Sequence, residues 1–474
     1  MKLIAQFVLH NDILDISSLT TTKCCVRLPP AMPTVSRSTK PKAMFRDPAF
    51  MGNRRVPIHR WVPWIAGFSG QFIQDAFREF LPKQSKLRRP LVLDPFAGVG
   101  TTLVEALLHG YDTVGFEINP YASLAARVKL SATELAPAKI AELIQAIRQE
   151  SQLWKDHHPN LTRYRPTEFV SRIPFFSERI EPQILNILRL LDTYPHREVA
   201  DLGRIALGAV LVGVSNYSYE PSLSSRPGAG KPLLEDADVA SIVNEKLEEI
   251  LADVRWLHVH QRDIGNERRE IYTKNFLAVN GELPSGSVDL MITSPPYMNN
   301  YHYIRNTRPH LFWLSFVTSP RELHRLEEDN FGKFWQTVRN ADPISLACEH
   351  HGLKTLIAEL REIRTDAGAY GGEGWANYVT TYFNDCNRFA QILRRVLRRG
   401  GAGVVVIGNS IIQGLNIATD RILADIAETN GLRLERIVPL RKKRVGASIT
   451  KSSVRRGLQS LGSLYESAVI LRKR

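Results

Sequence analysis

Residues 94–102 (DPFAGVGTT) combine an acidic residue with two glycines, where an apolar strand is expected to turn into a helix. Gly98 and Gly100 allow the backbone to pass close to a bulky ligand. The spacing matches neither the GxGxxG of dinucleotide-binding enzymes nor a P-loop, so no phosphate is required. Asp94 instead offers a carboxylate to a cationic or amino-bearing ligand. We therefore expect a ligand cradle made by Asp94, Phe96, Ala97, Gly98, Gly100, Thr101 and Thr102.

A second acidic residue follows the next expected strand. Glu117, followed by Ile118, stands where an acidic side chain usually holds a ribose hydroxyl in doubly wound folds. A nucleoside with an amino-acid-like end and no phosphate suits both carboxylates. Each alone has a plainer explanation, Asp94 as a helix cap and Glu117 as an exposed charge at a strand end, but the two in this register favour a ligand site.

The segment 293–297 (TSPPY) suits chemistry on an amine. Pro295 and Pro296 stiffen a turn that leaves a buried strand. Ser294 and the Pro295 carbonyl can accept hydrogen bonds from an exocyclic amine, and Tyr297 offers a face on which a planar base can stack. Neither a metal nor a carboxylate base is needed if the electrophile is an activated methyl group. In isolation a plain Pro-Pro turn explains the segment equally well, whereas beside the cradle it does not.

The elements around these residues predict an α/β fold. Residues 91–93 and 113–116 read as strands, 101–109 as a helix ended by Gly110, and Asn119 as the cap of a second helix with Pro120 first. This βαβα order is typical of a doubly wound, Rossmann-like parallel sheet. Further strands are expected at 256–263, 288–293, 401–410 and 466–473, with an amphipathic helix at 378–397.

The pattern predicts a core sheet interrupted by helical insertions. We expect an N-terminal arm at 1–55, the first part of the core at 56–130, a helical insertion at 131–250, the catalytic part of the core at 251–317, a second insertion at 318–373, and the last strands with a basic loop at 374–474.

Composition excludes several classes of protein. The 474 residues are 43% hydrophobic and 23% charged, as in ordinary globular proteins, and no apolar run is long enough for a membrane span. The four cysteines and the histidines show no metal-ligand spacing, so we expect no metal site, and the cysteines fit a reducing, cytoplasmic location.

Positive charge gathers at the C-terminal end. Residues 431–474 hold twelve basic residues and two acidic ones, within a chain of formal net charge +14. Such a patch favours a polyanionic partner, of which nucleic acid is the commonest. We expect phosphate contacts from a loop between two predicted strands, made by Arg441, Lys442, Lys443, Arg444, Arg455 and Arg456.

Taken together, these motifs resemble those of the S-adenosylmethionine-dependent DNA aminomethyltransferases, which modify cytosine N4 or adenine N6. Residues 94–102 are similar to the family's cofactor motif, Glu117 to the acidic residue of its second motif, and residues 294–297 to its catalytic motif. Asp263 resembles the acidic residue beside the adenine. Residues 59–68, ending in Phe68, resemble the cofactor-contacting segment before the first strand.

The resemblance implies methyl transfer from S-adenosylmethionine to a base amine of duplex DNA after base flipping, with Ser294, Pro295, Pro296 and Tyr297 as the catalytic residues. Ser at the first catalytic position is more frequent in the cytosine N4 enzymes, so Ser294 favours cytosine. A companion restriction endonuclease is the further partner that the resemblance implies. The region that reads DNA stays open, with 131–250 preferred by size over 318–373.

Three alternatives remain beside this interpretation. Adenine N6 is the other acceptor in the same family. A tRNA guanine N2 methyltransferase would use a similar turn, although such enzymes usually carry Asp-Pro-Pro-Tyr and an added RNA-binding domain. A nucleic-acid-binding protein that has lost catalysis is disfavoured by the intact Asp94, Glu117 and Ser294.

Overall fold

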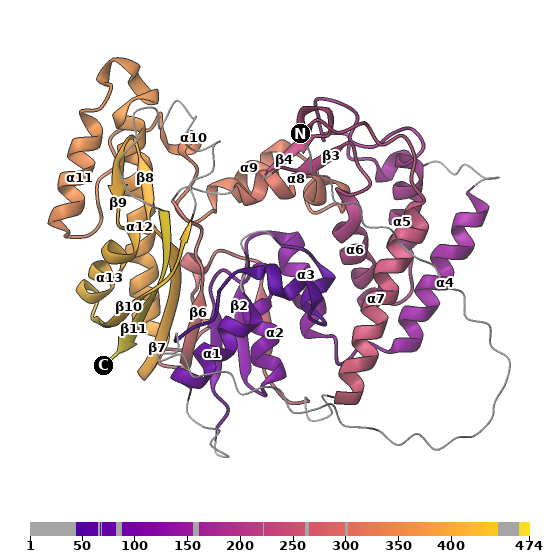
Figure 1. Cartoon of the computed structure of the whole chain (residues 1–474), viewed down its shortest axis with the longest axis horizontal. Coiled ribbons are helices and arrows are strands. Elements are labelled where there is room, and N and C mark those ends of the chain that lie inside the picture. Colours follow the sequence, from indigo (N-terminus) through magenta and orange to yellow (C-terminus); the bar gives the residue numbers. More distant parts are fainter. Residues whose placement is uncertain are drawn as a thin grey trace, which may run out of the picture. The chain divides into compact units, whose positions relative to one another are not determined.

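A seven-stranded sheet, ordered β10-β11-β7-β6-β1-β2-β5, organises the protein (Figure 1). The structure is a computed structural model that describes residues 44–64, 67, 69–81, 88–154, 161–220, 222–260, 265–298, 302–443 and 464–474. The strands β5, β2, β1, β6 and β7 are parallel, whereas β11 is antiparallel to β7 and β10. They span β1 Leu91–Asp94, β2 Asp112–Phe116, β5 Arg269–Tyr272, β6 Val288–Thr293, β7 Leu397–Gly408, β10 Leu432–Lys443 and β11 Leu464–Lys473.

Helices cover both faces of the sheet, because its central strands are apolar on both sides. Leu93 and Met291 belong to the core under α12 and α13, whereas Val92 and Leu290 belong to the core under α1. Such continuous apolar strands are typical of buried parallel sheets. The fold is therefore the doubly wound α/β sheet that the sequence predicts. The covering helices are α1 Gly70–Phe80, α2 Thr101–Leu108, α3 Pro120–Leu130, α12 Gly372–Val396 and α13 Thr419–Thr429.

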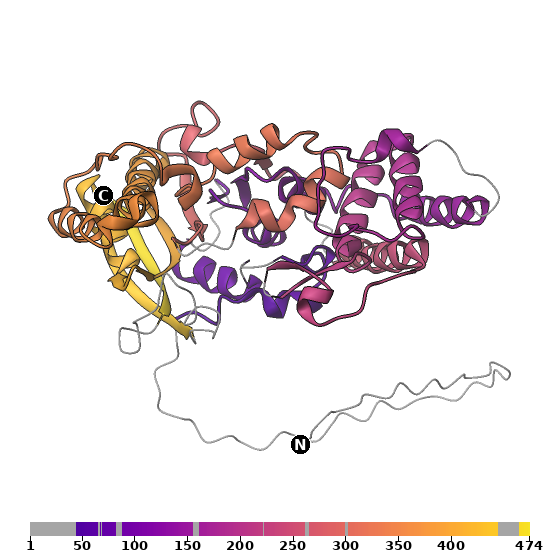
Figure 2. The same cartoon turned by 90° about the horizontal axis from the view of Figure 1, so that it is seen from above.

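The first insertion is a set of helices with a core of its own. Its apolar faces pack on one another and on α3 and α8, as in Ile144, Leu202 and Leu247. Seen from above, α8 and α9 lie between these helices and the last strands (Figure 2). The elements are α4 Pro137–Leu153, α5 Glu181–Asp192, α6 Arg197–Leu211, the hairpin β3 Tyr217–Tyr219 and β4 Leu223–Ser225, and α7 Val239–His260.

The second insertion is helical as expected, and a small hairpin follows β7. Its helices are α9 Pro320–Glu328, α10 Trp335–Val338 and α11 His351–Arg361, and α8 Tyr303–Trp313 lies before it, after the catalytic segment. The hairpin is β8 Ser410–Ile412 and β9 Leu415–Ile417. Short 3₁₀ helices lie at Phe50–Arg55, His59–Trp61, Thr162–Tyr164, Pro227–Ala229, Phe276–Ala278 and Thr365–Tyr370.

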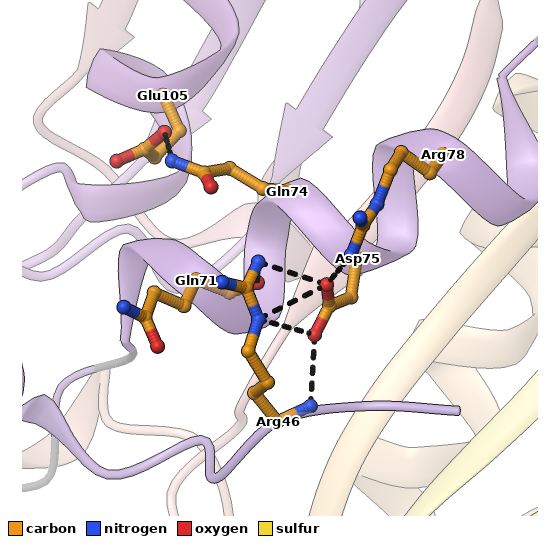
Figure 3. Close-up of polar contacts among 6 residues, drawn as sticks. All are labelled: Arg46, Gln71, Gln74, Asp75, Arg78 and Glu105. Carbon is orange, nitrogen blue, oxygen red and sulfur yellow. Dashed lines mark hydrogen bonds and ion pairs between the residues drawn. The ribbon is translucent and has the colours of Figure 1, made fainter. Parts of the chain in front are cut away.

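Polar contacts join the segment before α1 to that helix, and α1 to α2 (Figure 3). The Arg46 side chain donates to both carboxylate oxygens of Asp75 on α1, at 2.9 to 3.2 Å. Gln74 of the same helix donates to Glu105 of α2 at 3.0 Å, and His59 bonds the other oxygen of Glu105 at 2.8 Å. The bond from His59 ties the 59–64 segment to α2, the helix that follows the cradle. The expectation of an arm through residue 55 therefore fails for residues 44–55, while residues 1–43 lie outside the described chain.

The expected strand at 256–263 is wrong. Residues 256–260 are the last turn and a half of α7, and the sheet resumes only at β5, which pairs in parallel with β2. Leu257 continues the buried helical stripe of Ile250 and Val254, whereas Val259 is exposed. The aromatic and β-branched residues at the end of α7 are typical of strands, which led to the wrong prediction. The helical spacing of its buried residues predicts the observed helix correctly.

The expected loop around the basic residues is wrong in part. Arg441, Lys442 and Lys443 lie on β10, an edge strand that was not predicted. Its charges and Pro439 obscured the alternation, and such residues are tolerated on an edge strand.

Candidate active site

The carboxyl ends of β1, β2 and β6 bring the two predicted motifs to one edge of the sheet. The central strand β1 pairs with β2 on one side and with β6 on the other. In open doubly wound sheets a ligand binds where successive connections leave a strand in opposite directions. The Thr293 hydroxyl donates to Asp94 Oδ1 at 2.7 Å, which joins the end of β6 directly to the cradle.

Asp94 is a buried carboxyl group at this junction. Its side chain is 1% exposed and also accepts a hydrogen bond from Phe96 N at 3.1 Å. Burial raises its pKa to about 6, although the hydrogen bond from Thr293 opposes that rise. Asp94 is therefore poised to change charge near neutral pH when a ligand arrives.

Glu117 shapes the glycine turn from the adjacent strand. Its carboxylate accepts from Gly98 N at 2.8 Å and from Asn119 N at 2.7 Å. Burial raises its pKa to about 7, and the nearby charge of Asp94 raises it further. The Asn119 side chain caps α3, with Pro120 at the first helical position, as predicted.

Both cradle glycines have the left-handed backbone that favours glycine. Gly98 has φ 51°, and a Cβ there would lie 3.1 Å from the Trp64 indole nitrogen. Gly100 has φ 83° and precedes α2, where a Cβ would lie 2.8 Å from Ala126 Cβ of α3. Gly98 thus keeps the ligand side open, whereas Gly100 allows two helices to approach.

One pocket unites most of the predicted residues. Seven of the predicted cofactor residues line it together with two catalytic ones: Asp94, Phe96, Ala97, Gly98, Thr101, Glu117, Ile118, Ser294 and Pro296. Gly100, Thr102, Pro295 and Tyr297 are not among the lining residues. Phe68 and Asp263 lie outside the described residues.

The pocket also contains Trp64, from the segment 59–68 that resembles a cofactor-contacting segment, and residues that the sequence did not single out as cofactor residues. Trp64 stacks on Tyr303 of α8, with ring centroids 6.5 Å apart. The segment after β5, residues 274–276, and Phe331 also line the pocket. Lys274 is paired with Glu282, so the pocket's lysine is not free to bind a phosphate. Residues 274–276 closely follow strand β5, so a correct prediction of that strand would have pointed to them. The strand was predicted at 256–263 instead.

Two tyrosines of α12 hold the catalytic turn. Tyr382 OH donates to the Pro296 carbonyl at 3.0 Å, and Tyr378 OH donates to the Met298 carbonyl. The Ser294 hydroxyl lies 3.4 Å from Tyr297 OH. Because these bonds come from a long helix packed on the sheet, the turn is a rigid feature of the core.

Tyr297 is held from the opposite side by β7 and β11. Its ring lies against Gly408, where a Cβ would be 3.2 Å from the ring, and its hydroxyl bonds Glu466. Burial raises the pKa of Tyr297 well above its usual value, and the charge of Glu466 adds to that rise. The half-buried ring is thus a fixed wall beside Ser294.

The basic residues of the C-terminal part divide into paired, exposed and undescribed ones. Arg441 forms an ion pair with Glu466, which is 3% exposed, and lies 3.7 Å from Asp47. Lys442 is exposed. The side chain of Lys443 and all of Arg444, Arg455 and Arg456 lie outside the described residues, so their contacts with DNA stay predictions.

The described residues contain neither a metal-ligand cluster nor a membrane-spanning helix. No group of three or more His, Cys, Asp or Glu residues there is arranged to hold a metal ion. Within the same ranges, no helix combines the length and apolar character needed to cross a membrane.

Two kinds of comparison with known proteins bear on the family. Residues 72–127, which contain the cradle and Glu117, match the family model for DNA methylases of the N6/N4 type. The chain is 24% identical over 425 residues to the Type II methyltransferase M.AvaI of Nostoc sp., an alignment that covers 83% of this chain and 82% of that protein. It is 22% identical over 434 residues to M.BsoBI of Geobacillus stearothermophilus, covering 84% and 83%.

A solved rRNA methyltransferase, aviRa from Streptomyces viridochromogenes, also matches, with 10% identity, 87% of each chain covered and a TM-score of 0.26. So low a score carries no argument. The motif-bearing segment and the two long alignments agree with the geometry of the pocket. Residues 72–127 thus match the N6/N4 DNA methylases, and most of the chain is similar to Type II methyltransferases.

Proposed function

We propose that this DNA methyltransferase transfers a methyl group from S-adenosylmethionine to the exocyclic N4 amine of cytosine in duplex DNA. The observation that supports the proposal most is the bond between Thr293 and Asp94, because it joins residues 94–102 to the Ser-Pro-Pro-Tyr turn beside one pocket. The relatives named as Type II methyltransferases support DNA as the substrate.

The residues of the pocket suit this cofactor. Glu117 would accept from the ribose hydroxyls, and Asp94 would face the charged amino-acid end. The apolar side chains of Phe96, Ile118 and Phe276 would flank the adenine ring. Among the lining residues there is no arginine, which agrees with a ligand that carries no phosphate. When bound, S-adenosylmethionine supplies an electrophilic methyl group on a sulfonium.

The catalytic turn would orient the acceptor amine. Ser294 Oγ and the Pro295 carbonyl would accept its two N–H groups, which directs the nitrogen lone pair toward the pocket. Tyr297 is held by Glu466, so its ring would support the base edge. As the N–C bond forms, the methyl–sulfur bond would break and leave a neutral thioether, and the amine, now cationic, would give up one proton to water. Ser294, rather than Asp, supports cytosine over adenine.

The base must leave the duplex to reach this pocket, at a cost of a few kcal/mol. An enzyme that acts on DNA must work in the compartment that holds the DNA. We therefore expect this one in the cytoplasm. A companion restriction endonuclease recognising the same site is part of the proposal, and purified chain would protect DNA from that nuclease.

The acceptor class can be tested with methyl-labelled S-adenosylmethionine and three acceptors: duplex DNA, tRNA and no nucleic acid. We expect label on duplex DNA with the wild type and none with Ser294→Ala. The Ser294→Ala variant must first bind the cofactor like wild type, which shows that its pocket is intact. Label on tRNA alone would overturn the proposal in favour of RNA.

A further inference from the structure

Helix α8 follows the catalytic segment. One of its faces lies on the cofactor pocket, and another lies on a separate groove. Tyr303 and Ile304 line the cofactor pocket, and the Thr307 hydroxyl accepts from Asn119 Nδ2 at 2.7 Å. Arg305 and Arg308 project instead into a separate groove. Because residues three apart share a face of a helix, both guanidinium groups belong to one surface.

The groove lies between α8, the segment before α5 and the β3–β4 hairpin. Arg172 enters it from the segment before α5, and the Ser224 and Ser225 hydroxyls come from the hairpin. It thus gathers three cationic side chains with hydroxyl groups, from stretches far apart in the sequence. Tyr219 OH of the hairpin donates to the Asn306 carbonyl of α8 at 2.9 Å, so the two elements lie side by side, as in Figure 1.

The positive charge of the groove is not neutralised from within. Among the described residues, Arg172, Arg305 and Arg308 form no ion pair. Other arginines of the same insertion do: Arg165 pairs with Glu181, Arg179 with Asp236 and Arg189 with Glu150. Glu327 acts on Arg308 through its charge, but it is not among the residues that line the groove, and none of those residues is acidic. The groove therefore lacks an anion.

Arg308 is already held in place for such an anion. Its guanidinium lies over the rings of Phe169 and Phe312, 5.1 and 5.6 Å from their centroids. A charged group fixed in this way loses less conformational entropy on binding than a free surface side chain.

We propose that this groove, with Arg172, Arg305 and Arg308, binds the phosphate backbone of duplex DNA beside the extruded base. Guanidinium and hydroxyl groups are the usual donors to phosphate oxygens. Arg308 is five residues beyond Tyr303 on the helix, about 7.5 Å along its axis. A strand whose base enters the pocket must therefore carry its neighbouring phosphates past this face. The inference rests on the proposed function and names the part of the helical insertion that contacts DNA.

The test measures DNA affinity against salt for Arg172→Ala, Arg305→Ala and Arg308→Ala, singly and together. Each substitution should weaken binding about 3- to 10-fold, equally for different sequences. The slope of log K against log salt should fall by about 0.9 for each lost phosphate contact. Arg179→Ala is the matched control, an exposed arginine of the same insertion that is paired with Asp236, and should bind DNA like wild type.

Cofactor affinity should be unchanged in every variant, which confirms that each is folded. If the triple variant fails this check, Arg305→Glu alone replaces it, because Arg305 is exposed and its charge reversal should weaken binding further. If the wild type methylates DNA but the variants keep its DNA affinity and salt slope, the groove does not bind the DNA backbone. The proposed function would still stand. Loss of tRNA binding with intact DNA binding would also overturn it. A wild type that methylates no DNA would overturn the proposed function itself.

Discussion

Asp94 and Glu117 are two carboxyl groups whose protonation should change when a ligand binds. Burial raises their pKa values to about 6 and about 7, so both are partly protonated near neutral pH without a ligand. A cationic ligand favours their charged forms, and so does a ribose hydroxyl that donates to Glu117. Because the two groups interact, they titrate as a pair. Cofactor binding should therefore release protons.

The first prediction follows from the sign of these shifts. Below a pH of about 6 the ligand must displace protons, so the association constant for S-adenosylmethionine should rise with pH and level off above about 7.5. Calorimetry in two buffers of different ionisation enthalpy measures both the affinity and the proton release. In Asp94→Asn the release should shrink and the affinity should fall. Affinity that is the same from pH 5.5 to 8.5 would contradict this linkage.

The second prediction separates binding from transfer. Ser294→Ala should lower the transfer rate at least about a hundredfold, because the amine loses a positioned acceptor. Tyr297→Ala should have a similar effect. Both should keep cofactor affinity within about twofold, since neither removes a group that holds the cofactor. Single-turnover rates and equilibrium dialysis give the two quantities, and Asp94→Ala should show the reverse pattern. Equal loss of cofactor binding in Ser294→Ala would refute the division of roles.

The sequence indicated those acids and Ser294 because each directly follows an apolar strand, a position that local patterning reveals. Trp64 lies in the segment 59–68 that the sequence indicated, whereas Phe331 reaches the same pocket from a segment far from the motifs, and only the folded chain brings it there. The role of Asp263 stays a prediction.

Gly100 belongs to the cradle and also allows helix α2 to pack closely on helix α3. Gly100→Ala should destabilise the protein by about 1 to 3 kcal/mol, because alanine is strained at φ 83° and its Cβ would meet Ala126 at 2.8 Å. Urea unfolding measures this cost. Gly281→Ala is the control, since an added Cβ there meets nothing within 4 Å. Equal stability of the two variants would show that the close approach is not needed.

Glu466 on β11 couples two neighbouring strands to the catalytic turn. It bonds Tyr297 and pairs with Arg441, so we predict that Glu466→Gln slows transfer while the KM for cofactor stays unchanged. If Glu466 acts by positioning Tyr297, the double variant with Tyr297→Phe should be no slower than the slower single variant. Additive losses would assign Glu466 a role independent of Tyr297.

The elements differ in how clearly the sequence marks them. Strand β6 and helix α3 have clean apolar patterns or caps and were predicted at nearly their observed bounds. Strand β5 was placed too early, because aromatic and β-branched residues end α7. Strand β10 was missed because an edge strand tolerates charges and proline.

For the whole molecule, net charge predicts a polyanionic partner but not where it binds. Three basic residues of the C-terminal part, Arg436, Arg441 and Arg472, have acidic partners in the structure. The groove beside α8 instead presents three arginines without such partners among the described residues. Composition counts charges, whereas only the fold decides which of them remain available to DNA.

The central claim, methylation of a base amine in DNA, is tested most directly by the chemical identity of the product. Duplex DNA of mixed sequence would be incubated with the full chain and methyl-labelled S-adenosylmethionine, digested, and its nucleosides identified by mass spectrometry. We predict labelled N4-methylcytosine. Labelled N6-methyladenine would keep the site and correct the base, whereas label on cytosine C5, or none on DNA, would contradict the account.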